Sequence, residues 1–133
     1  MSFLGLGIGD VVLVSSLALR LYQAFKSAPR DFEDLTFQFL SISEILDQIG
    51  NVYEHLYLNR QQRLHLHHLL SQSHSLLKDL EDDIHRYGKN GHEGGAWQII
   101  KWQLGGADGI NQLKQRLMEK VIMLTNFNTT VTV

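Results

Sequence analysis

The chain has 133 residues, of which 44% are hydrophobic and 20% charged, with a net charge of −2 and no cysteine. It is long enough to bury the core of one ordinary domain, and it has no thiols for a disulfide framework or for thiolate catalysis. The weak negative charge gives no reason to expect a general affinity for nucleic acid.

The N-terminal segment is the most unusual part of the chain. Residues 1–9 form an apolar, glycine-rich leader, and Asp10 precedes a run of valines and leucines. Because a carboxylate there accepts hydrogen bonds from free first-turn N–H groups, Asp10 is expected to begin a helix. Apolar residues recur at helical spacing as far as Phe25, and others lie off that face. A helix this apolar needs burial in a bundle, a partner or a bilayer.

This helix does not match a standard transmembrane segment or a secretory signal. Only nine uncharged residues separate Asp10 from Arg20, against about 20 for a spanning helix. No Lys or Arg precedes the apolar run, and no small-residue cleavage pattern follows it.

The remainder of the chain predicts further helices at the three-and-four spacing of apolar residues. The single proline, Pro29, marks a turn before the second helix, Asn59 caps the third helix and Asp108 caps the last. The second helix is predicted to run to about residue 58 with no break at Gly50, and the third, after its cap at Asn59, to about residue 87. A glycine-rich loop at 88–95 and a short helix at 96–104 follow. The last helix is predicted from 109 to about 127, with a frayed tail at 128–133.

These segments predict an all-α domain spanning residues 1–133. The expected architecture is an up-and-down bundle of four long helices and one short helix, with an apolar N-terminal leader and antiparallel neighbours. On the third helix Leu64 is expected to point inward, and the acidic residues 81–83 outward. At least one of Trp97 and Trp102 is expected to plug one end of the bundle.

No residue pattern in the chain indicates an enzyme. His65 and His68 share a helix face, but the HExxH spacing of zinc hydrolases is missing, so the histidines are interpreted as a partly exposed, titratable helix surface. The glycine-rich stretches at 5–9 and 88–95 lack the Lys-Ser/Thr of a phosphate-binding loop. The prediction is therefore no catalytic residue, no metal site and no cofactor.

Four stretches of the chain resemble a known family. The stretches are GIGDV at 7–11, AFKSAPRDF at 24–32, LSISEIL at 40–46 and IKWQL at 100–104. They are similar to the HeLo-like N-terminal domains of fungal STAND (NLR-like) receptors, which are related to HeLo cell-death execution domains. The resemblance covers nearly the whole chain.

The resemblance implies a cell-death execution domain that forms pores in membranes. Such a domain rests in the cytoplasm, releases its N-terminal segment on activation, oligomerises and damages the plasma membrane, in heterokaryon incompatibility, programmed cell death and fungal innate immunity. The implied partners are membrane lipid, further copies of the chain, and a STAND receptor or sister HeLo-like domain, with no nucleic acid. The implied membrane-insertion residues are Phe3, Leu4, Leu6, Ile8, Asp10, Val11, Val12, Leu13 and Val14.

A second interpretation is that the domain is a soluble oligomerisation or adaptor module of a signalling receptor, with no membrane activity. The sequence favours neither a particular lipid nor a particular oligomer size. It also leaves open whether the chain is an excised domain or a protein that acts alone.

Overall fold

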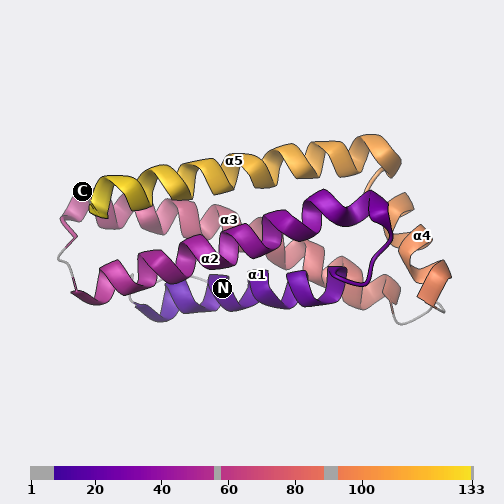
Figure 1. Ribbon diagram of the computed structural model, residues 1–133, viewed down its shortest axis with the longest axis horizontal. Helices are drawn as coiled ribbons and strands as arrows, with labels where there is room; N and C mark the ends of the chain where they lie inside the picture. The colour runs from indigo at the N-terminus through magenta and orange to yellow at the C-terminus, as the bar shows by residue number, and fades with distance from the viewer. Residues whose placement is uncertain (1–7, 56–57, 89–92, 133) are drawn as a thin grey trace.

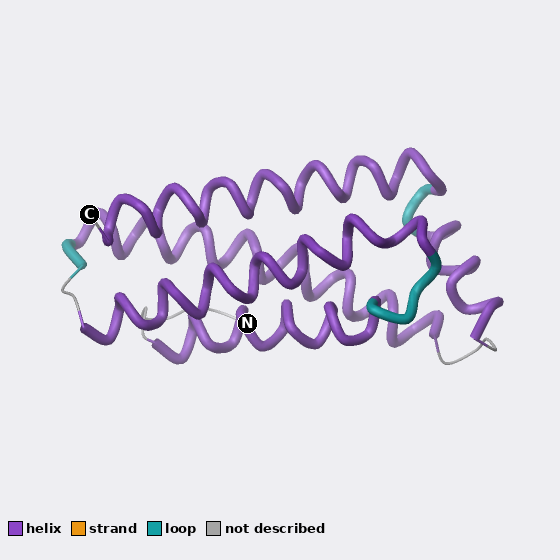
Figure 2. Tube along the Cα trace, in the orientation of Figure 1, coloured by secondary structure: helices purple, strands orange, loops and turns teal. Residues whose placement is uncertain are grey.

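The computed structural model describes residues 8–55, 58–88 and 93–132, and within these ranges every regular element is a helix. The predicted all-α bundle of four long helices and one short helix is confirmed (Figures 1 and 2). The elements are α1 (Ile8–Phe25), the 3-10 turn η1 (Arg30–Phe32), α2 (Glu33–His55), α3 (Arg60–Gly88), the short α4 (Glu93–Gln103) and α5 (Gly106–Thr132).

The long helices alternate in direction along the chain, and α4 closes one end of the bundle (Figure 1). The close backbone neighbours are α1 with α2, α2 with α5, α1 with α3 and α3 with α5. Two of these neighbouring pairs, α1 with α3 and α2 with α5, run parallel (Figure 1). Helices joined by short connections thus run antiparallel, as predicted, and the parallel pairs join helices that are not consecutive in the chain (Figure 1).

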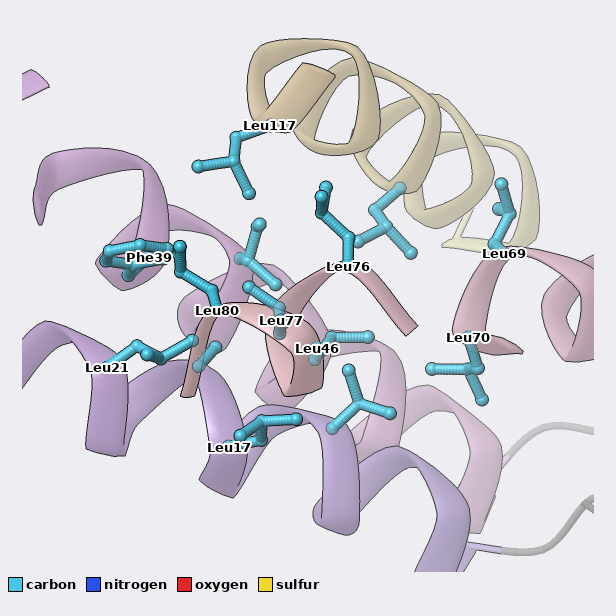
Figure 3. Packing of buried hydrophobic residues seen from close by; sticks show 14 of the residues in the cluster. Leu17, Leu21, Phe39, Leu46, Leu69, Leu70, Leu76, Leu77, Leu80 and Leu117 are labelled. Carbon is cyan, nitrogen blue, oxygen red and sulfur yellow. The ribbon is translucent and has the colours of Figure 1, made fainter. Parts of the chain in front are cut away.

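The core runs along the bundle axis and receives side chains from all four long helices (Figure 3). Leu17 and Leu21 of α1 point toward the leucines of α3, and Phe39 of α2 and Leu117 of α5 lie in the same cluster (Figure 3). The predicted inward face of α1 is confirmed, since its members from Val11 to Phe25 are buried except Tyr22, which is partly exposed.

The start of α3 follows the predicted cap. The Asn59 side chain accepts a hydrogen bond from the Gln62 backbone N–H at 2.8 Å, and the Asn59 N–H donates to the Gln62 side chain at 2.9 Å. This reciprocal pair is a capping box, which satisfies two donors that the first turn would otherwise leave unpaired. The predicted continuity of α2 through Gly50 is also confirmed.

Several predicted boundaries are wrong. Asp10 and Asp108 are not caps but lie in the first turns of α1 and α5, which begin at Ile8 and Gly106. The loop predicted at 88–95 is shorter, because α3 includes Gly88 and α4 starts at Glu93. The tail does not fray within the described residues, since α5 reaches Thr132 and buries Phe127 and Val131.

Two side-chain predictions on α3 are also wrong. Leu64 is exposed, because it lies two positions from the buried Leu66 and residues two apart cannot share a helix face. Glu81 is 7% exposed rather than solvated. It follows the core position Leu80 and turns toward α1.

Candidate functional site

The structure separates the predicted membrane-insertion residues into two groups. Phe3, Leu4 and Leu6 lie outside the described residues. Ile8, Asp10, Val11, Val12, Leu13 and Val14 form the first two turns of α1, within a helix and not in a separate leader. Val11 and Val14 belong to the core, Ile8, Asp10 and Leu13 are partly exposed, and Val12 is 53% exposed. The segment therefore has an anchored side and a free side.

The anchored side of the first turn lies on Gly50 of α2. A Cβ atom at Gly50 would lie 3.3 Å from Cδ1 of Ile8 and 3.6 Å from Cγ1 of Val11. The missing side chain lets the Ile8 and Val11 side chains pack directly on the backbone of α2.

Beyond Val14, α1 is joined to α2 through a buried hydroxyl. Ser15 Oγ donates to Asp47 Oδ1 at 2.7 Å and lies 3.2 Å from both the side-chain oxygen and the carbonyl of Ser43. Since one hydroxyl has one proton, the short contact to Asp47 takes it, and the Ser43 hydroxyl is left to donate back to Ser15. This cluster satisfies two buried polar side chains in the α1–α2 interface.

On its other side, α1 is joined to α3 through an ion pair. Arg20 Nε donates to Glu81 Oε2 at 2.9 Å and Arg20 Nη2 to Oε1 at 3.3 Å, a two-point contact. Lys78 Nζ lies 3.4 Å from the same carboxylate. The hydrogen bonds from Arg20 hold the pKa of Glu81 below its ordinary value, against the opposing effect of burial. Arg20 and Glu81 thus tie the C-terminal half of α1 to the C-terminal half of α3.

The free side of α1 is a ridge of exposed side chains at positions 12, 16, 19, 23 and 26. Val12 and Leu19 provide exposed apolar surface, and Ser16, Gln23 and Lys26 complete the ridge. Four of these five are uncharged and the fifth is Lys26; Arg20, which is also exposed and pairs with Glu81, lies beside the ridge. We call this surface the α1 ridge.

The two tryptophans of α4 have different roles. Trp97 packs against Phe25 and Phe32, with ring centroids 5.1 and 5.2 Å apart, so it closes the end of the bundle as predicted for at least one of them. Trp102 is 80% exposed. Lys101 fixes α4 beside the α1–α2 turn through a 2.7 Å ion pair with Asp31.

The histidines do not converge. Within the described residues there is no group of three His, Cys, Asp or Glu side chains able to hold a metal ion. His65 packs edge-to-face against Phe127 at 5.6 Å. Burial lowers the pKa of His74, and the charge of Lys78 acts in the same direction.

Two further findings bear on function. By length and composition, α1 is the one described helix apolar enough to cross a membrane, although a core helix of a soluble bundle meets the same criterion. Comparison with family models, curated proteins and solved structures gives no match.

Sequence reasoning missed both polar connections of α1, at Ser15 and at Arg20. A serine and an arginine within an apolar helix are the signal, since each needs a partner when the helix is buried.

Proposed function

We propose that this domain acts on membranes and causes cell death through its N-terminal apolar segment after oligomerisation. The observation that carries the proposal is the α1 ridge together with the apolar leader that precedes it. Val12 and Leu19 are exposed apolar side chains on this ridge, 53% and 40% exposed. Exposed apolar side chains that follow an apolar stretch in the sequence favour a bilayer as their acceptor.

The packing of α1 limits how the segment could act. Releasing the whole helix would expose Val11, Val14, Leu17, Leu21 and Phe25, all at most 1% exposed. At about 2 kcal/mol for each side chain this costs roughly 10 kcal/mol, as much as the stability of a typical domain. Whole-helix release therefore needs an acceptor, either lipid or other copies. Detachment of the first turn alone is far cheaper, since Val11 is its only fully buried side chain.

The test is release of a dye from liposomes by the wild-type chain and by Leu4→Glu/Leu6→Glu. We expect the wild type to cause leakage and the variant to lose it, because charge in the leader opposes insertion. The matched control is Leu64→Glu/Trp102→Glu, which adds the same charge at exposed apolar positions of α3 and α4. Equal leakage by the wild type and the leader variant, or no leakage at any lipid composition, would contradict the proposal.

A second candidate function is a soluble oligomerisation or adaptor module. The observation that favours it is the outer face of α5, where Met118 and Ile122 are exposed one turn apart. If this candidate is right, Met118→Glu/Ile122→Glu dissociates a soluble oligomer in sedimentation experiments. In that case Leu4→Glu/Leu6→Glu leaves the oligomer unchanged, and liposomes have no effect on either variant.

A further inference from the structure

A groove of about 320 Å³ lies where α1 ends and α2 begins. Its lining combines the aromatic rings of Tyr22 and Phe37 with the cations Lys26 and Arg30. Phe37 is 58% exposed, which is unusual for a phenylalanine on a polar helix surface. Aromatic side chains beside Lys and Arg are the combination that suits the headgroup region of a bilayer.

The two cations are free to bind an anion. Among the residues that the structure describes, no carboxylate forms an ion pair with Lys26 or Arg30, whereas Lys101, Lys114 and Arg20 each have one. Both free side chains are exposed.

The remaining polar groups of the groove leave Lys26 and Arg30 available to an anion. Glu33 is the one carboxylate in the lining, against two cations. The hydroxyl of Thr36 is already committed, since it donates to the Phe32 carbonyl at 2.9 Å. The groove therefore keeps a net positive rim.

We propose that this groove docks the domain on an anionic lipid bilayer, with Lys26 and Arg30 binding lipid phosphates and Phe37 entering the headgroup boundary. This inference rests on the proposed membrane function and assigns its first step, surface attachment, to residues separate from the leader. Lys26 is also the last residue of the α1 ridge. Docking at the groove thus lays Val12 and Leu19 along the bilayer surface.

The test is co-sedimentation of the full chain with phosphatidylcholine vesicles, with and without phosphatidylserine. We expect binding to require phosphatidylserine. Lys26→Gln/Arg30→Gln should weaken binding about 30-fold, from about fivefold for each cation lost near an anionic surface. The matched control is Arg60→Gln/Arg63→Gln, which removes two exposed cations at the start of α3. It should bind within about twofold of the wild type.

Phe37→Ala supplies a second variant, since truncating an exposed side chain leaves the core intact. It should weaken vesicle binding severalfold while keeping the requirement for phosphatidylserine. Equal losses in the groove and control variants, or full binding by Lys26→Gln/Arg30→Gln, would overturn the inference. So would displacement by millimolar inorganic phosphate, which would identify a site for a soluble anion.

The outcome is separable from that of the leakage test. If Leu4→Glu/Leu6→Glu and the wild type bind vesicles equally but neither causes leakage, the docking groove stands and the proposed cell-death function fails. If Lys26→Gln/Arg30→Gln binds vesicles with the affinity of the wild type and still causes leakage, the groove is not the attachment site.

Discussion

Arg20 of α1 and Glu81 of α3, which lie 61 residues apart in the chain, form a two-point ion pair with contacts of 2.9 and 3.3 Å. The carboxylate is nearly buried, and the guanidinium is about half exposed. Because removal of the exposed partner leaves a buried charge behind, the two sides of the pair are not equivalent.

Arg20→Gln is therefore expected to destabilise the domain by about 1–2 kcal/mol, less than a fully buried pair because water reaches Arg20. Urea unfolding would measure this as a lower midpoint with an unchanged slope. Lys78→Gln is the control, since that lysine contacts the same carboxylate from solvent and should matter less. In the Arg20→Gln/Glu81→Gln double variant part of the loss should be restored; if the losses simply add, the two side chains are not coupled.

The same pair predicts how stability depends on pH. The pKa of Glu81 is lowered in the folded protein from an ordinary value of 4.5, mainly by the hydrogen bonds from Arg20. The unfolded chain therefore takes up this proton first as the pH falls. The stabilisation is complete above about pH 4.5 and is lost as the pH falls through the lower, folded value. Below about pH 4.5, wild type should lose more stability than Glu81→Gln; parallel curves would contradict this assignment.

At Gly50, substitution tests the contact between α2 and the first turn of α1. Gly50→Ala should be close to neutral, because the gain of up to about 1 kcal/mol in helix propensity is offset by the approach of its Cβ to Cδ1 of Ile8 at 3.3 Å. Gly50→Leu should displace the first turn. Hydrogen exchange would then quicken at Val11 and Val12 but not at Leu21, whereas uniform quickening would indicate global destabilisation.

Ser73 offers a stabilising substitution. Its hydroxyl is buried in α3 with no hydrogen-bond partner among the described residues, so desolvation of the hydroxyl is uncompensated. Ser73→Ala should raise the free energy of unfolding by about 1 kcal/mol, and the higher helix propensity of alanine contributes to this gain. Thermal unfolding would show it as a higher Tm. Ser75→Ala, at an exposed position of the same helix, controls for the propensity term.

The fold was predictable from the sequence because apolar spacing fixes a helical face locally. Val11 through Phe25, and the capping box at Asn59, follow from residues within a few turns of one another. The position of Glu81 depends instead on Arg20, which is remote in sequence. The C-terminal end of α5 likewise depends on burial of Phe127 against other helices. This burial outweighs the low helix propensity of the threonine-rich tail.

The candidate site was predictable only as a segment. An apolar leader can be read from composition, but its division into a core side and the α1 ridge depends on which face meets α2 and α3. The docking groove could not be found from spacing, since it combines the end of one helix with the outer side of the next.

The pairing of α2 with α5 has a consequence for biosynthesis. Asp34 with Lys114, Gln38 with Met118 and Gln48 with Asn128 each join residues 80 apart, in a constant parallel register. The hairpin of α1 and α2 can form as soon as α2 has left the ribosome, but its α5-facing side must wait for α5. Until then the α5-facing side of α2 stays open to solvent, so a chain that has made α2 but not α5 presents apolar surface to which a chaperone can bind.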